Sequence, residues 1–271
     1  MPLLSLATLL ALPAGVGIDE EVDAWEPRAR PLLDGPAACV QVQGQATVAL
    51  AVMQPGGWRG PGKTEHHTLS GPFTGTLDHG VWRELTAALT TAPGVSPAVR
   101  MTDLMPVTGR KAGAHKKGEV QLSLTTGDNG ESFDISAAGA QGINLVDGIL
   151  EGIRPDVTLS WMEAGPDNGV VLVQRAPVKG ADDDEMIDLR TTFPGRGAPS
   201  RLDVTLPRVI KVGDGLVKAS IYDGQVHVLA TPTPLGPLPT EESASVVAGL
   251  LGFTVGVDQR LTYTAYRPCG G

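Results

Sequence analysis

Aromatic residues are scarce in this sequence, in which phenylalanine, tryptophan and tyrosine together make up 4% of 271 residues. Proteins that bind single-stranded nucleic acids stack bases on aromatic rings, and few such rings are available here. Positive charge is also in short supply, because 21 lysine and arginine residues are outnumbered by 30 acidic residues. The resulting net charge of −9 repels phosphate backbones and anionic headgroups. The composition therefore argues against nucleic acid as a partner.

Cysteine is nearly absent, with Cys39 close to the start of the expected fold and Cys269 close to its end. Two cysteines are too few for a zinc site built from thiolates, and the sequence has no Cys-x-x-Cys redox motif. In an oxidising compartment an even pair is most simply a disulfide, and the alternative is two buried free thiols. We expect a disulfide that pins the first and last strands together or ties the tail over the start of the sheet.

No apolar run in the sequence has the length of a membrane-spanning helix, which needs about 20 residues. The run LLSLATLLAL at residues 3–12 is followed by the small residues PAGVG, a pattern typical of signal peptides. No lysine or arginine precedes it, so the usual basic segment is missing. We expect a signal peptide at residues 1–17, a periplasmic or secreted protein, and no transmembrane span in residues 18–271.

Familiar catalytic and metal-binding motifs are also missing. We find no Gly-x-Ser-x-Gly nucleophile elbow, no His-Glu-x-x-His and no Gly-x-Gly-x-x-Gly. His66 and His67 are adjacent in an expected strand, so their side chains point to opposite faces. The acidic run at residues 182–185 lacks the alternating spacing of a calcium loop. We expect no cofactor, no metal and no catalytic residue.

One basic stretch, GRKAGAHKKG, lies within an expected loop at residues 108–118. It is a candidate anion-contact loop for a headgroup, and the alternative is an ordinary exposed loop. The residues that would make the contact are Arg110, Lys111, Lys116 and Lys117.

Glycine and proline are abundant, at 35 and 22 residues, which suits short strands joined by turns. Alternating apolar and polar residues predict a first strand at CVQVQGQATVALAVM, from Cys39, and a last strand at QRLTYTAYRP. Asn-Gly and Asp-Gly pairs between such segments indicate hairpins, so a mainly β, antiparallel meander in a single domain is expected. We predict turns at residues 78–80, 128–130, 167–169, 214–215 and 223–224. We predict further loops at residues 54–63, 178–185, 194–200 and 231–239.

Helical patterns are few. Residues 18–34 predict a broken helical lead-in, because Pro27 and Pro31 interrupt a long helix. The spacing of Ile143, Val146, Ile149, Leu150 and Ile153 predicts a short helix at residues 142–153. The segment 240–252 fits a helix capped by Thr240, and it equally fits a strand running into FTVGV.

The order of these elements is a helical lead-in, the strand VQVQGQ, hairpins, a mid-chain helix and further hairpins that include ASIYDGQVHV. This order resembles the periplasmic lipoprotein-carrier superfamily, the half-barrels of the LolA and LppX type. The resemblance covers most of residues 18–268 as a pattern of elements. It implies a strongly curved antiparallel sheet or half-barrel with two or three short helices, and a sheltered site for a lipid or another hydrophobic ligand.

Three functions remain after these exclusions. The expected one is an exported, non-catalytic envelope or secreted protein that binds a lipid or another hydrophobic small molecule in a curved sheet. The second is a structural or interaction module that contacts an envelope protein and has a filled core, and the third is an enzyme without a recognisable motif. Inward-facing side chains would line a cavity in the first case and fill a core in the second: Val42, Leu50, Leu122, Leu124, Leu172 and Val228.

Overall fold

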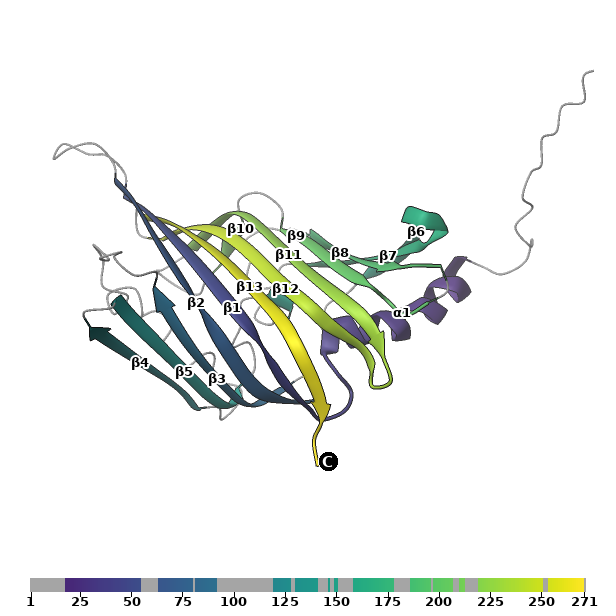
Figure 1. Ribbon diagram of the computed structural model, residues 1–271. Helices are drawn as coiled ribbons and strands as arrows, with labels where there is room; N and C mark the ends of the chain where they lie inside the picture. Colours follow the sequence, from purple (N-terminus) through teal and green to yellow (C-terminus); the bar gives the residue numbers. More distant parts are fainter. Residues whose placement is uncertain are drawn as a thin grey trace, which may run out of the picture.

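The computed structural model of this chain is mostly β, as the sequence predicts, with one long helix, α1 (Ile18–Asp34) (Figure 1). Thirteen strands of the described part belong to one antiparallel sheet, which is not closed. The residues described are 18–54, 63–79, 81–91, 119–127, 130–140, 146, 149–150, 158–177, 186–195, 197–206, 210–212, 219–250 and 253–270. The expected signal peptide, residues 1–17, lies outside them.

The strands form two arms that meet at the middle of the sheet. The first arm contains β1 (Val40–Gln54), β2 (Lys63–Asp78), β3 (Val81–Thr91), β4 (Glu119–Gly127) and β5 (Gly130–Ala140). The second arm contains β6 (Leu159–Ala164), β7 (Val170–Pro177), β8 (Met186–Phe193), β9 (Arg201–Leu206), β10 (Ile210–Val212), β11 (Ala219–Thr233), β12 (Gly236–Leu250) and β13 (Phe253–Pro268).

The first and last strands, β1 and β13, are the neighbours that join the two arms. From β1 the sheet continues through β2, β3 and β5 to its edge at β4. From β13 it continues through β12, β11, β9, β8 and β7 to its other edge at β6. The short strand β10 pairs with β11 and is not part of this strand order. The sheet curves around the side on which α1 lies, and we call this side the inner face (Figure 1).

Strict alternation of burial along β1 explains how the sequence produces this sheet. Val40 and Val42 are buried at 0% and 1% exposure, whereas Gln41 between them and Gln43 after them are exposed. Successive side chains of a strand point to opposite faces, so one face of β1 enters the core and the other meets solvent. The predicted first and last strands are therefore confirmed as β1 and β13.

Three of the predicted turns are hairpin connections. His79 has a φ of 52° between β2 and β3, and Asp167 and Asn168 have φ values of 53° and 58° in the short 3-10 helix η3 (Pro166–Asn168) between β6 and β7. Gly127 pairs with Gly130 across the turn from β4 to β5. Aspartate, asparagine and histidine tolerate positive φ better than other non-glycine residues, which is why these motifs predicted turns correctly. The predicted turn at 214–215 lies outside the described residues, between the paired strands β10 and β11.

The predicted turn at Asp223-Gly224 is wrong, because both residues lie within the continuous strand β11. The pairing of β11 with β12 shifts its register between Ile221 and Asp223, so the motif directly follows a β-bulge. A Cβ atom at Gly224 would lie 2.4 Å from Leu206 Cδ1 of the neighbouring strand β9. The glycine therefore permits a close packing contact rather than a change of chain direction.

The predicted loop at 231–239 is also wrong over most of its length, because β11 continues to Thr233 and β12 begins at Gly236. The tight connection ends at Gly236, whose φ is 103°. Thr233 Oγ1 donates to the carbonyl of Gly236 over 2.7 Å. For the ambiguous segment 240–252, the strand interpretation is correct through Leu250 and the helix interpretation is wrong, because β12 pairs with β11 on one side and β13 on the other.

Helix α1 is unbroken over its 17 residues, so the expectation of a broken lead-in is wrong. Pro27 is exposed and Pro31 half-buried. The carbonyls that these prolines leave without an intrahelical partner can therefore bind water. Burial supplies the stability that the prolines remove: the apolar side of the helix carries Val22, Ala29, Leu32 and Leu33 into the core. Of the predicted helix at 142–153, the described residues Val146, Ile149 and Leu150 are helical.

Gly44 occupies the point where the pairing of β1 and β13 shifts its register. A Cβ atom there would lie 2.3 Å from the Thr262 carbonyl oxygen and 2.5 Å from the Phe73 ring. We expect Gly44→Ala to lower the free energy of unfolding by about 1–3 kcal/mol, because backbone and ring must both move. Gly256→Ala is the matched control, since its Cβ atom would be 3.5 Å from its nearest neighbour, Ala51 Cβ. Equal losses in urea unfolding of the two variants would contradict this packing argument.

Candidate functional site

Three groups of buried apolar side chains cover the inner face. Cluster A belongs to the first arm and β13, and in the described part its buried members all come from strands: Val40, Val42, Ala46, Leu69, Phe73, Leu77, Ala87, Leu89, Leu261 and Tyr263. Cluster B combines the second arm with helical residues: Leu32, Leu33, Val146, Leu150, Ala176, Ile187, Leu189, Leu202, Val204, Leu206, Val226, Val228, Ala230 and Ala244. Cluster C joins α1 to β7 and β8: Val22, Ala29, Leu172 and Phe193.

The expected lining residues fall into different clusters. Val42 belongs to cluster A, Val228 to cluster B and Leu172 to cluster C, and each is at most 1% exposed. Leu50, Leu122 and Leu124 are strand residues whose side chains lie outside the described part. The structure therefore places three of the six predicted residues on the inner face, spread across both arms.

A buried carboxylate, Glu242, separates clusters A and B. Glu242 is 8% exposed, and its cross-strand partners are Val228 of cluster B and Leu261 of cluster A. The Tyr263 hydroxyl donates to Glu242 Oε2 over 2.9 Å. Sequence reasoning missed this residue, because it lies in the segment whose secondary structure was ambiguous.

Tyr263 and Tyr266 continue this polar group toward cluster A. Their rings stack with centroids 5.5 Å apart, and Tyr263 meets Phe73 edge to face at 5.4 Å. The Tyr266 hydroxyl donates to the Pro239 carbonyl over 2.5 Å. Burial, together with the nearby Glu242 carboxylate, raises the pKa of the Tyr266 phenol, which therefore stays protonated as a donor. The border between clusters A and B is thus aromatic with a few satisfied polar atoms.

Helix α1 is anchored on the inner face by ring contacts with β8. The Trp25 ring meets Phe193 edge to face with centroids 4.8 Å apart, and Phe193 is fully buried. The Arg28 guanidinium lies 4.0 Å above the Trp25 ring and 5.4 Å from the Phe193 ring centroid. Arg28 also donates to the backbone carbonyl of Gly197. These contacts fix the helix across β6, β7 and β8.

Polar side chains gather between α1 and the same three strands. Ser160 of β6 donates to Glu26 Oε1 of α1 over 2.5 Å, and Ser160 pairs across the sheet with Gln174 of β7. Thr191 of β8 lies one diagonal step from Gln174, because Gln174 pairs with Leu189 and Thr191 with Leu172. We call Glu26, Ser160, Gln174 and Thr191 the Gln174 site.

The Gln174 site contains polar atoms that the fold leaves unsatisfied. Gln174 is 6% exposed and Thr191 is 0% exposed. Gln174 Oε1 and Thr191 Oγ1 have no hydrogen-bond partner. Nearly all buried polar atoms in native proteins are hydrogen-bonded, so such orphans mark a place where a partner is missing. Sequence reasoning missed both residues, because a polar residue in an alternating strand carries no sign of which face it occupies.

The outer face of the second arm carries ion pairs. Arg175 binds Asp188 at 2.6 Å and 2.9 Å, and its guanidinium lies 4.9 Å from the Trp161 ring centroid. Glu163 accepts from Arg190 and from the Trp161 indole, and these hydrogen bonds lower the pKa of its carboxyl. Arg175 and Asp188 come from the paired strands β7 and β8, and the Glu163–Arg190 contact spans β7 from β6 to β8, so these contacts reinforce the sheet.

His227 of β11 alternates with the buried Val226 and Val228, so it lies on this outer face. Its Nδ1 is 2.5 Å from Asp203 Oδ1, and Arg201 donates to the same carboxylate over 2.6 Å. Burial by itself would raise the pKa of Asp203, but the hydrogen bonds from Arg201 and His227 outweigh burial and hold it below its usual value. The arrangement is a strand-to-strand clamp on the face opposite the Gln174 site.

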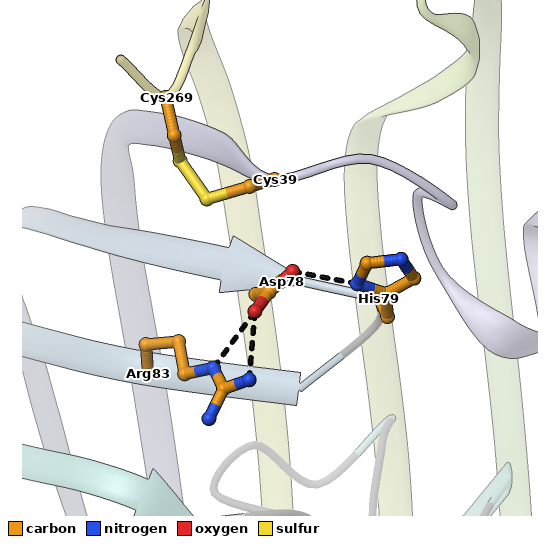
Figure 2. The surroundings of a disulfide bond; sticks show 5 residues. All are labelled: Cys39, Asp78, His79, Arg83 and Cys269. Carbon is orange, nitrogen blue, oxygen red and sulfur yellow. Dashed lines mark hydrogen bonds and ion pairs between the residues drawn. A yellow bond between two sulfur atoms is a disulfide. The ribbon is translucent and has the colours of Figure 1, made fainter.

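The disulfide predicted from the sequence is present between Cys39 and Cys269, whose Cα atoms are 5.4 Å apart (Figure 2). The amide of Cys269 also donates to the carbonyl of Cys39 over 3.1 Å, one step beyond the Val40–Pro268 pair. The bond therefore pins the first and last strands together. A disulfide fits an oxidising location outside the cytoplasm.

Next to the disulfide, the turn between β2 and β3 is held by Asp78 (Figure 2). Its carboxylate accepts two hydrogen bonds from Arg83, at 2.7 Å and 2.9 Å, and lies 2.6 Å from His79 Nδ1. These hydrogen bonds lower the pKa of Asp78. The group is exposed apart from the carboxylate, which suits a turn clamp rather than a binding site.

The candidate anion-contact residues Arg110, Lys111, Lys116 and Lys117 lie outside the described residues. Residues 57–64, GWRGPGKT, match the Gly-x-x-x-x-Gly-Lys-Thr pattern of a phosphate-binding loop, so an absence of that pattern would be a wrong reading of the sequence. That motif needs a helix directly after the loop, where backbone amides cradle phosphates. Here Lys63 opens the strand β2, so the structural context of a phosphate-binding loop is missing.

Within the described part of the chain, no group of three or more histidine, cysteine or acidic residues is placed to hold a metal ion. The same part contains no helix whose length and hydropathy would allow it to cross a membrane. No protein-family model matches the sequence, and no curated protein matches it either.

Proposed function

We propose that this protein is an exported, non-catalytic binding protein that holds a lipid or another amphiphile against the inner face of its curved sheet. The observation that carries the proposal is the division of the inner face into separate apolar clusters. A domain with a filled core usually has one contiguous apolar cluster with small satellites. Here clusters A and B are both large, cluster A lies on the first arm and β13 while cluster B lies on the rest of the second arm, and the polar Glu242 is between them.

Other features of the molecule agree with this proposal. The sheet is open rather than closed on itself. Helical residues pack into clusters B and C, whereas cluster A has none among the described residues. The disulfide suits work in an oxidising compartment. The resemblance to periplasmic lipoprotein-carrier half-barrels points the same way as an analogy of fold.

The test uses binding of a dodecyl-chain fluorescent probe and two variants at adjacent positions of β3. Ala87 is buried in cluster A, whereas its neighbour Ala88 is exposed on the outer face. We expect the wild type to bind the probe and Ala87→Leu to bind it about tenfold more weakly. The larger side chain takes space that the alkyl chain would use. Each methylene group of the probe that can no longer be buried weakens the binding free energy by about 0.8 kcal/mol. Ala88→Leu should bind like the wild type.

Circular dichroism of both variants controls for folding. Mass spectrometry of a solvent extract of the purified protein is expected to find a co-purified lipid. A wild-type protein that binds no alkyl probe and carries no lipid would refute the proposal and favour a structural module with a filled core.

A further inference from the structure

Among the described residues, the buried side-chain polar atoms without a hydrogen-bond partner are both in the Gln174 site. Gln174 Oε1 and Thr191 Oγ1 are both buried and unpaired, on adjacent strands and on the same face. Burying an acceptor without a partner is unfavourable, so a protein gains by supplying a donor there. A ligand that binds at this site should therefore carry a hydrogen-bond donor.

The charges around the site limit that chemistry further. Glu26 reaches the site from α1 as a half-buried carboxylate that accepts from Ser160. Arg28, the nearby cation, stacks on Trp25 and donates to the Gly197 carbonyl. The Gln174 Oε1 atom accepts only, and the Thr191 hydroxyl both donates and accepts. A carboxylate or phosphate cannot donate to Gln174 and is repelled by Glu26, whereas an alcohol satisfies both orphans.

We propose that the Gln174 site binds the uncharged, hydroxyl-bearing headgroup of the amphiphile. This inference rests on the proposed function and names its ligand class as a neutral lipid alcohol, such as a monoacylglycerol. One headgroup hydroxyl donates to Gln174 Oε1 and accepts from Thr191 Oγ1. Because α1 covers the site, binding requires α1 to move and then to close again.

The test compares monolauroylglycerol with laurate, which has the same chain length and a carboxylate in place of the glycerol. We expect the wild type to prefer monolauroylglycerol by about tenfold. Thr191→Val and Gln174→Met keep the side-chain size and remove the orphan atoms. Each variant should bind monolauroylglycerol about fivefold more weakly, as loss of a hydrogen bond predicts, and leave laurate binding unchanged. Thr192→Val, on the outer face of the same strand, should change neither affinity.

Two further measurements accompany binding. Hydrogen exchange of residues 18–34 is expected to slow when monolauroylglycerol binds, because the ligand holds α1 on the sheet. Without ligand, Thr191→Val should raise the unfolding midpoint, because it removes an unsatisfied hydroxyl. A lower midpoint would show that the hydroxyl already has a partner, such as a buried water, and would overturn the inference.

The outcomes separate this inference from the proposed function. If the dodecyl probe binds but the wild type does not prefer monolauroylglycerol, the headgroup inference fails and the binding function stands. If the preference exists but survives in both Thr191→Val and Gln174→Met, the headgroup binds elsewhere and the inference also fails. If neither the probe nor either lipid binds to the wild type, both proposals fail.

Discussion

Removal of the Cys39–Cys269 disulfide is expected to lower the free energy of unfolding by about 2–5 kcal/mol. The bond closes a loop that spans 230 sequence positions, and in the chain-entropy model the stabilisation grows with the length of the loop. The folded protein brings the same two strands together without the bond, since β1 and β13 pair along almost their whole length. The disulfide therefore acts mainly by restricting the unfolded chain, and we expect the reduced protein to keep its fold at low temperature.

The measurement is urea unfolding of the wild type with and without reductant, beside a Cys39→Ser, Cys269→Ser double variant. The double variant should match the reduced wild type and should not respond to reductant. Thiol titration of the denatured, non-reduced wild type should find no free cysteine, since both cysteines are paired. Equal stability of the oxidised and reduced proteins would show that strain or residual structure cancels the entropic gain.

Phe193→Ala is expected to lower the free energy of unfolding by about 3–5 kcal/mol, as is usual for truncating a buried aromatic ring. Phe193 is fully buried, and its ring contacts Trp25 on α1. The truncation leaves a cavity under the helix and removes the surface on which Trp25 and Arg28 rest. We therefore expect α1 to loosen before the rest of the sheet.

Two measurements test this order of events. Hydrogen exchange should accelerate in residues 18–34 of Phe193→Ala more than in β1 or β13, and urea unfolding should report the total loss. Phe193→Leu is the matched control, because it keeps most of the apolar volume and should cost less than about 1.5 kcal/mol. Uniform acceleration of exchange across the sheet would mean that α1 and the strands unfold as one unit.

A loosened α1 also bears on ligand binding. The Gln174 site lies between α1 and strands β6 to β8, and Glu26 of the helix forms part of it. A helix that opens more readily exposes the site more often but holds a ligand less firmly. Hydrogen exchange of residues 18–34 in Phe193→Ala therefore shows how fast exchange becomes when α1 opens readily. The slower exchange expected for the ligand-bound wild type can be compared with that rate.

Local sequence patterns were sufficient to predict those strands and turns whose conformation depends mainly on residues nearby in the chain. Alternation predicted β1 and β13, and Asp-His-Gly and Asp-Asn-Gly sequences predicted the connections after β2, β4 and β6, because aspartate, asparagine and histidine tolerate positive φ better than other non-glycine residues. The disulfide followed from the count of cysteines and the expected export. Local signals failed where tertiary contacts outweighed them. Burial of one side of α1 overcame Pro27 and Pro31, and Gly224 permits the close approach of Leu206 within a continuous strand rather than a turn.

By itself, the sequence determined the β class and the first and last strands, which the two cysteines flank. Only the tertiary structure decided that these strands meet in the middle of an open sheet, and that Gln174, Thr191 and Glu242 face inward. The physical reason is that alternation assigns residues to two faces without saying which face will be covered. The cover comes from α1 and from distant strands, so a buried polar atom without a partner can be recognised only in the folded protein.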